Sequence, residues 1–252
     1  MRRPVVCALL GLVLLAGCSS GDGGADASPG TATITHTTTA APSATGSAAG
    51  CPSSGDGVPA GADQAPTVDV DGDGRPDTEW IAQQHGSDGG VTFGVTTASG
   101  GTATAVIRSA SPVARSVLVA DVTGRGEVVA LASDGRQVLL YAVWDCGLVP
   151  VLNEQGQQYA FDLGFTGFGT GVGCADVDGD GVTDLLGLLL QPPGAQNGEA
   201  MVQQTIVVLD GAVARNGATI ASPAGDEARQ EAAQSVTCGD LTLDTDGVTS
   251  AP

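Results

Sequence analysis

Two short stretches, each nine residues long and carrying four aspartates, constrain this chain more than any other feature of its sequence. One reads DVDGDGRPD and runs from Asp69 to Asp77; the other reads DVDGDGVTD and runs from Asp176 to Asp184. Glycine stands at the same offsets in both stretches. Carboxylates packed this closely repel one another, so a stable fold is expected to place a cation among them.

The spacing of the aspartates favours calcium as that cation. Carboxylates occupy positions 1, 3, 5 and 9 of each loop, glycine at position 6 permits a sharp turn, and position 7 offers a backbone carbonyl. Calcium takes about 6–8 oxygen ligands, which such a loop supplies. The predicted ligands are Asp69, Asp71, Asp73, the carbonyl of Arg75 and Asp77 in the first loop, and Asp176, Asp178, Asp180, the carbonyl of Val182 and Asp184 in the second.

An EF-hand is the obvious competing interpretation of these loops, and the sequence argues against it. An EF-hand needs a bidentate glutamate at position 12 and a helix on each side. Position 12 is Trp80 in the first loop and Gly187 in the second, and the flanking residues have no helical periodicity. Each loop instead closes at position 9 and runs into an expected strand.

The acidic loop recurs along the chain. A third copy, VADVTGRGEVVAL, has its opening aspartate at Asp121, and a damaged copy, CGDLTLDTDGV, has it at Asp240, so the four copies are spaced by 52, 55 and 64 residues. A period near 50 is typical of a propeller blade or a solenoid unit. In the copy at Asp121 we expect Arg125 to pair with Asp121 in place of a metal, and the copy at Asp240 has the wrong spacing for strong binding.

Each period contains strand signals rather than helical ones. The second period holds four apolar, β-branched runs, at 117–120, 127–133, 137–143 and 148–152. Four strands per period is the number in a propeller blade. The sequence therefore predicts an all-β fold, a β-propeller-like array of three to four four-stranded blades with calcium loops, and one short helix within 226–234. Only half of the fourth unit is present; residues 58–66 could complete it, the ring could be open, or a second chain could close it.

A family resemblance points the same way. GFGTGVGCADVDGDGVTDLLGLLL, residues 167–190, resembles the FG-GAP/VCBS repeat, with Phe168-Gly169 ahead of the lead-in strand, the acidic loop, and an apolar run after it. At blade level the resemblance covers about residues 66–243, although the first repeat lacks the Phe-Gly pair. It implies an integrin-α-like β-propeller whose strand-connecting loops bind calcium in a mostly structural role.

The N-terminal residues indicate export and lipidation. Arg2 and Arg3 precede an apolar run at 5–16, which is too short for a membrane span of about 20 residues. The run ends in Leu-Ala-Gly-Cys, which resembles a bacterial lipobox with Cys18 as the lipidated residue. We therefore expect a lipoprotein signal peptide at 1–17, a Ser/Thr/Gly/Ala-rich tether at 18–57 and a folded domain at 58–252, anchored on the outer face of the bacterial cytoplasmic membrane.

Four cysteines remain after Cys7 and Cys18 are assigned to the signal peptide and the lipid anchor. Cys51, Cys146, Cys174 and Cys238 allow two disulfides with three possible connectivities. Cys174 and Cys238 both lie two residues before an opening aspartate, so a bond between them would join successive repeats and leave Cys51 to pair with Cys146. The sequence leaves this connectivity open.

The composition narrows the function. A net charge of -19 disfavours nucleic acid as a partner. No serine-hydrolase, zinc-protease or phosphate-loop motif is present, and His85 is the only histidine outside the tether. The leading interpretation is a lipid-anchored, extracytoplasmic calcium-binding β-repeat domain that binds a protein or glycan ligand and is not an enzyme. The alternatives are a purely structural envelope domain and a hydrolase with an unrecognised carboxylate pair.

Overall fold

The computed structural model describes residues 50–194 and 198–252. The predicted signal peptide, Cys18 and the tether up to residue 49 lie outside the described residues. Within the described ranges, no helix has the length and apolar character needed to cross a membrane.

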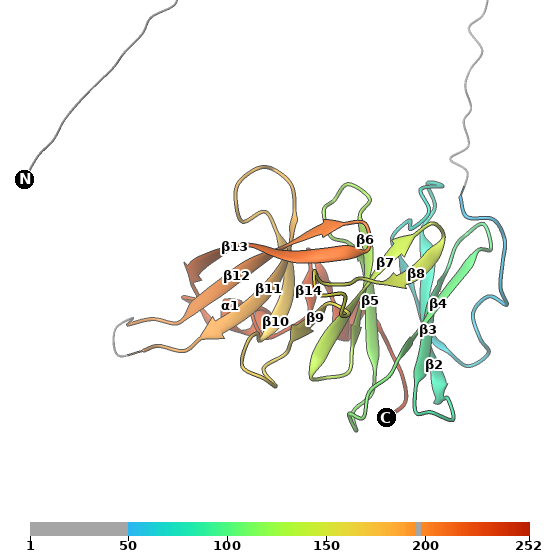
Figure 1. Ribbon diagram of the computed structural model, residues 1–252, viewed down its shortest axis with the longest axis horizontal. Coiled ribbons are helices and arrows are strands. Elements are labelled where there is room, and N and C mark those ends of the chain that lie inside the picture. Colours follow the sequence, from blue (N-terminus) through green and yellow to red (C-terminus); the bar gives the residue numbers. More distant parts are fainter. Residues whose placement is uncertain (1–49, 195–197) are drawn as a thin grey trace, which may run out of the picture. The chain divides into compact units, whose positions relative to one another are not determined.

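The described chain is all-β and forms four antiparallel sheets (Figure 1). The first sheet contains β1 (Asp63–Thr67), β2 (Asp77–His85), β3 (Val91–Thr96) and β4 (Thr102–Ile107). The middle sheet contains β5 (Ser116–Asp121), β6 (Val128–Ser133), β7 (Gln137–Trp144), β8 (Gly147–Pro150), β9 (Ala160–Asp162) and β16 (Val248–Thr249). The third sheet contains β10 (Gly171–Ala175), β11 (Asp184–Gln191), β12 (Met201–Asp210) and β13 (Val213–Pro223). The C-terminal hairpin contains β14 (Thr237–Cys238) and β15 (Leu241–Thr242).

The first three sheets share one topology. Each is built on four strands that follow one another in sequence and pair in that order, β1 to β4, β5 to β8 and β10 to β13. The strands expected from the second period match β5 to β8 to within two residues at each end. The all-β prediction is therefore confirmed, and three of the four sheets contain four strands paired in sequence order. The arrangement of these sheets as blades around one axis stays a prediction.

The middle sheet carries the core on both of its faces. Side chains alternate across a strand, so consecutive residues of β6 face opposite neighbours. Val129 and Leu131 belong to a cluster shared with the third sheet and the C-terminal hairpin. Ala130 and Ala132 belong to a second cluster shared with the first sheet. Every residue of β6 is buried as a result, and the middle sheet lies between the other two (Figure 1).

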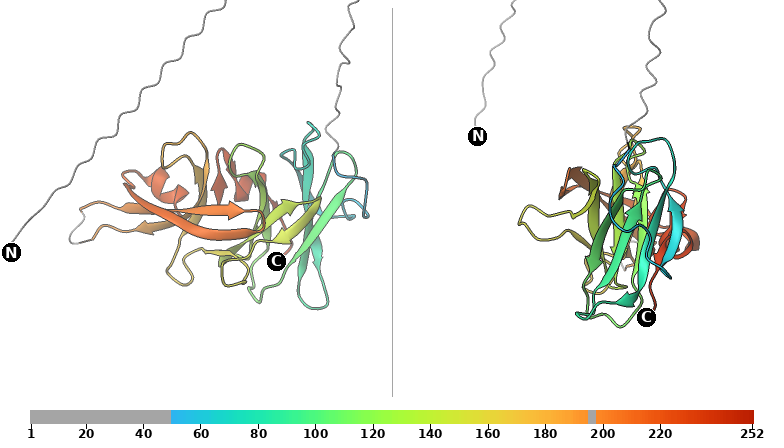
Figure 2. Two further views of the ribbon diagram at one scale, coloured as in Figure 1. Left: turned by 45° about the horizontal axis from the view of Figure 1, so that its top comes forward. Right: turned by 90° about the vertical axis from the view of Figure 1, so that its right-hand side faces the viewer.

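Residues on either side of α1 (Glu227–Ala232; Figure 2) pack against the third sheet, whereas the helix itself has no buried residue. Leu186 and Leu188 of β11 pack there with Ala233, the residue that ends the helix. Asp226 begins the helix, because its carboxylate accepts the backbone N–H of Arg229 at 2.8 Å. The short helix expected within 226–234 is confirmed.

The last strand returns to the middle sheet. β16 pairs with β5, and the backbone N–H of Thr249 donates to the carboxylate of Asp63 at 2.8 Å. Of the three alternatives left open for the half unit, completion by residues 58–66 does not agree with the strand pairing. Strand β1 pairs with β2 instead, because the acidic loop at 69–77 folds the chain back on itself and makes these two strands antiparallel neighbours.

Two disulfides join parts of the fold. Cys51 pairs with Cys146 in the turn between β7 and β8, and Cys174 of β10 pairs with Cys238 of β14. These are the pairs suggested by the position of the cysteines in the repeats. Cys51 is buried, so residues 50–57, which the sequence assigned to the tether, begin inside the packed body.

A buried carboxyl lies between the first and middle sheets. Glu79 of β2 is 1% exposed, and it accepts the backbone N–H of Val119 at 2.6 Å. It borders a cavity of about 420 Å³ that Asp246, the last residue of α2 (Leu243–Asp246), also lines. The pKa of Glu79 is raised to about 8. Burial is the main cause, the Val119 hydrogen bond opposes the shift, and the charge of Asp246 adds to it.

This carboxyl makes the stability of the protein depend on pH. A raised pKa means that its contribution is fully present below the ordinary value of 4.5 and is lost as the pH rises to about 8. We expect Glu79→Gln, which can still accept the Val119 N–H, to remove this loss. The measurement is urea unfolding in chelator at pH 5, 7 and 9. The free energy of unfolding of the variant, relative to that of the wild type, should rise by on the order of 3 kcal/mol from pH 5 to pH 9. Parallel curves for the two proteins would contradict the assignment.

Candidate functional site

Acidic loops connect the first and second strands of all three larger sheets. In each loop the glycines at positions 4 and 6 have positive φ, from 67° to 89° across the six residues. The position-6 N–H donates to the position-1 carboxylate: Gly74 to Asp69 at 2.7 Å, Gly126 to Asp121 at 2.8 Å, and Gly181 to Asp176 at 3.0 Å. Only glycine adopts such φ values without strain. The turn is therefore built by its glycines and its first aspartate.

The first loop gathers three carboxylates. Asp69, Asp71 and Asp77 each place an oxygen within 4.8 Å of the others. Asp73, which the sequence also predicted as a ligand, is not in this group. Its carboxylate forms an ion pair with the guanidinium of Arg75 at 2.6 Å.

The second loop repeats this arrangement. Asp176, Asp178 and Asp184 gather within the same 4.8 Å limit. Asp180, the counterpart of Asp73, lies outside the group and accepts the backbone N–H of Val182 at 2.7 Å. Positions 1, 3 and 9 thus converge in both loops. The position-5 aspartates and the carbonyls of Arg75 and Val182 stay predicted ligands.

The donor set fits a hard divalent cation. Both groups consist of carboxylate oxygens alone, without a histidine nitrogen or cysteine sulfur. In the first loop Asp77 is 2% exposed and accepts the N–H groups of Val70 and Ala98, each at 2.7 Å. Burial raises the pKa of Asp77 against these two hydrogen bonds, and the charges of Asp71 and Asp69 raise it further. Mutual repulsion of this kind is what a bound cation would relieve.

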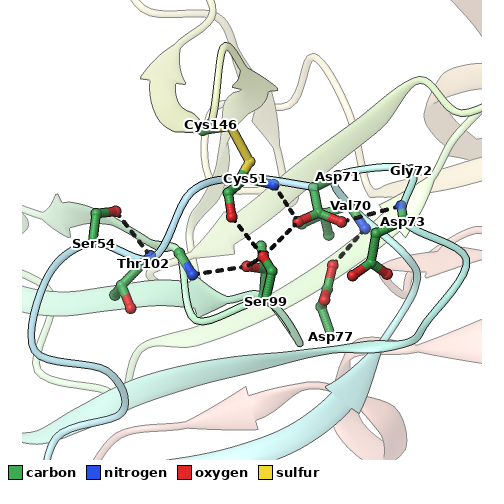
Figure 3. The surroundings of a disulfide bond; sticks show 12 residues. Cys51, Ser54, Val70, Asp71, Gly72, Asp73, Asp77, Ser99, Thr102 and Cys146 are labelled. Atoms are coloured by element: carbon green, nitrogen blue, oxygen red, sulfur yellow. Dashed lines mark hydrogen bonds between the residues drawn. A yellow bond between two sulfur atoms is a disulfide. The ribbon is translucent and has the colours of Figure 1, made fainter. Parts of the chain in front are cut away.

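The first loop is also tied to a disulfide (Figure 3). The backbone N–H of Cys51 donates to Asp71 at 2.7 Å. The hydroxyl of Ser99 lies 2.6 Å from the carbonyl oxygen of Cys51 and 3.2 Å from the Asp71 carboxylate. A Cβ at position 50 would come within 2.6 Å of that carboxylate, so glycine is required next to the loop. The Cys51–Cys146 bond therefore fixes the backbone that holds one of the three gathered aspartates.

The remaining two copies of the loop differ from these. The expected pairing of Arg125 with Asp121 is wrong: in the described part of the chain the ion pairs are Arg75–Asp73 and Arg108–Asp88. The N–H groups of Thr123 and Gly126 satisfy Asp121 instead, and Arg125 is exposed. Asp240 lies in the turn between β14 and β15, where the chain makes a tight hairpin and not an acidic loop.

A cavity larger than the one beside Glu79 lies elsewhere, in a groove of about 660 Å³ between the middle and third sheets. Its middle-sheet side includes Gln137 and Phe161, and its third-sheet side includes Gly187, Gln203 and Thr205. Further into the same interface the facing side chains are apolar, such as Leu185 and Val207. At Gly187 a Cβ would lie 3.5 Å from the Phe161 ring, so the missing side chain leaves room between the sheets.

A loop at one edge of the groove holds two phenylalanines, and we call residues 163–168 the Phe loop. Asp162 fixes it by accepting the backbone N–H groups of Thr166, Phe168 and Gly169. Desolvation acts to raise the pKa of Asp162, but these hydrogen bonds outweigh it and lower that pKa to about 2. Phe165 and Phe168 are nevertheless 67% and 86% exposed.

The groove was not predicted from the sequence. Phe168-Gly169 was interpreted only as a mark of the repeat, whereas the Phe168 ring is exposed in the structure. Two phenylalanines in a glycine-rich segment, DLGFTGFGT, were the available signal. The two tryptophans of the chain are not among the residues that line the groove. Trp80 is buried against Gly94, and Trp144 is exposed near Gly211.

Comparison of the chain with family models, with curated proteins and with solved structures gave no match.

The low pKa of Asp162 gives a prediction for the Phe loop. A lowered pKa means that the carboxylate stabilises the fold above its ordinary pKa of 3.8, and that this is lost as the pH falls through about 2. We expect Asp162→Asn to lower the melting temperature by a few degrees at pH 6, because a neutral amide accepts the three N–H groups less strongly. The difference from the wild type should shrink at pH 2.5. An equal difference at both pH values would show that the charge of Asp162 is not responsible.

Proposed function

We propose that this protein is a non-catalytic binding module of the cell envelope, whose repeated β-sheets are stabilised by calcium held in two acidic loops. In this proposal Asp69, Asp71 and Asp77 bind one ion, and Asp176, Asp178 and Asp184 bind the other. Asp73 and Asp180 are predicted to join them, together with the carbonyls of Arg75 and Val182. The ions would neutralise the clustered charge and stiffen the turn between two strands.

One observation carries the proposal. Two loops separated by more than a hundred residues gather carboxylates from the same three positions, 1, 3 and 9. Three carboxylates within 4.8 Å in a chain of net charge -19 are costly without a cation. The loop at Asp121 folds in the same way with a single aspartate, so the other carboxylates are not needed to make the turn. Their convergence goes beyond what the turn requires, and this supports a role in binding a cation.

The residues that line the two cavities support a binding role. The groove between the middle and third sheets contains no histidine, cysteine or lysine. Its two carboxylates, Asp134 and Asp162, are engaged by backbone N–H groups. In the second cavity Glu79 is 1% exposed, which leaves it no access to a substrate. These features support recognition of a ligand over hydrolysis.

The metal proposal can be tested by calcium titration calorimetry on the purified protein. We expect two bound ions for the wild type and one for Asp178→Asn. Asp178 suits this test because it is exposed and its carboxylate accepts only the N–H of Asp180. At about 100 times Kd a site adds about 2.7 kcal/mol to stability, so calcium should also raise the melting temperature and chelator should lower it.

Asp210→Asn is the matched control, because Asp210 is an exposed aspartate in the β12–β13 turn, outside both loops. It should retain two ions. A parallel titration with magnesium identifies the preferred metal. Two calcium ions in Asp178→Asn, or no heat of binding in the wild type, would refute the proposed sites.

Membrane attachment is part of the proposal and is supported by the sequence of the first 18 residues. We expect the wild type to fractionate with bacterial membranes and Cys18→Ser to move to the soluble or secreted fraction, because acyl chains supply the anchoring energy. Equal membrane fractions for the two proteins would exclude Cys18 as the anchor.

A further inference from the structure

We propose that the groove between the middle and third sheets is a binding site for a neutral glycan, with the rings of Phe165 and Phe168 as stacking surfaces. This deepens the binding role proposed above and rests on it. The volume of the groove, about 660 Å³, is in the range of ligand pockets, about 300–1,000 Å³.

The exposure of the Phe loop is the first support. Phe168 and Phe165 have the largest exposed fractions of any large hydrophobic side chain in the described ranges, 86% and 67%. The loop that carries them is held in place by three hydrogen bonds to Asp162 and by glycines with positive φ at 164 and 167. Ordering a loop costs conformational entropy. A loop that is ordered without burying its aromatic rings is arranged to present them to a partner.

The polar side chains of the groove indicate the chemical class of ligand that it would bind. The side-chain amides of Gln137 and Gln203 line it and make no hydrogen bond within the described part of the chain. Asn216 and Thr205 line it as well, at the point where the pairing of β12 with β13 shifts register, and each of these side chains also makes one hydrogen bond within the protein. All four side chains are uncharged and can donate or accept hydrogen bonds. They suit a ligand with many hydroxyl groups.

The two carboxylates of the groove are already engaged within the protein. Asp134 accepts the hydroxyl of Ser109 and the N–H groups of Arg136 and Gln137. Asp162 holds the Phe loop. The guanidinium of Arg136 lies 4.8 Å from the centre of the Phe165 ring, where it is attracted by the ring face and helps to fix the ring. The two carboxylates of the groove are thus engaged, and the guanidinium of Arg136, which forms no ion pair among the described residues, is the charged group that stays exposed there.

A sugar fits this combination better than a peptide or an anion. Its ring has hydroxyl groups at the edge and C–H groups on its faces, and those faces stack on aromatic rings. An extended peptide that adds to a sheet needs an open strand edge. Strands β7, β11 and β12, which contribute to the lining, have paired neighbours on both sides, and β9, which pairs only with β7, offers an edge of three residues. Anions are disfavoured by the net charge of -19.

The test is binding of defined oligosaccharides to the full-length protein in calcium. The probes are cellohexaose, laminarihexaose, maltohexaose, mannohexaose and chitohexaose, with a hyaluronan hexasaccharide as the anionic probe and an unstructured peptide of neutral composition as the peptide probe. We expect at least one neutral hexasaccharide to bind, and Phe165→Ala or Phe168→Ala to weaken it by tenfold or more. Gln203→Ala should weaken the same probe several-fold.

Trp144→Ala is the matched control, because Trp144 is an exposed aromatic residue outside the groove, 58% exposed. It should bind the sugar like the wild type. Because the phenylalanine rings are exposed, their removal should leave the melting temperature and the calcium stoichiometry unchanged. That control separates failure of this inference from failure of the calcium proposal.

Three results would overturn the inference. One is the absence of binding by every neutral hexasaccharide at millimolar concentration. Another is undiminished binding in the double variant Phe165→Ala/Phe168→Ala. The third is binding of the hyaluronan or peptide probe alone, which would assign the groove to a different class of ligand.

Discussion

Burial of the middle sheet on both faces is the constraint on which the rest of this structure depends. Val129 and Leu131 of β6 need partners on one side, and Ala130 and Ala132 need partners on the other. Neither neighbouring sheet can therefore be removed without exposing apolar surface that costs about 25 cal/mol per Å². The same packing decides where cavities form. The sheets close tightly where Leu185 and Val207 meet the middle sheet, and they separate where glycine and polar residues replace them.

In the acidic loops, the residues that make the turn differ from the residues that gather the negative charge, although both belong to one sequence pattern. The turn needs its glycines and its first aspartate, and all three loops have them. Gathering of charge needs positions 3 and 9 as well, which only the loops at Asp69 and Asp176 supply. The first of these is further held by Cys51 through Asp71. A metal would thus bind to a conformation that the chain already adopts, which reduces the ordering cost of binding.

The sequence predicted the all-β class, most strands and the convergence of Asp69, Asp71 and Asp77, because strand alternation and turn glycines act locally. It did not predict contacts that depend on distant residues. Asp73 turns to Arg75, two residues away, since an exposed arginine competes for that carboxylate. The burial of Glu79 requires the N–H of Val119 from another sheet. Pairing of β16 with β5 was missed because a strand of two residues has no detectable period. The Phe loop was missed because its exposure depends on the hydrogen bonds of Asp162.

The return of β16 to the middle sheet has a consequence for the order in which the fold assembles. Apart from β16, most strands of each sheet pair with a strand that is close in sequence, so they can meet after a short loop closes. The bond between Thr249 and Asp63 joins residues 186 positions apart and brings the two ends of the described domain together. The entropy of closing so long a segment must be overcome before that contact contributes any stability. Individual sheets should therefore form early, and the kinetic barrier to the native state should lie at the step that seats the final strand.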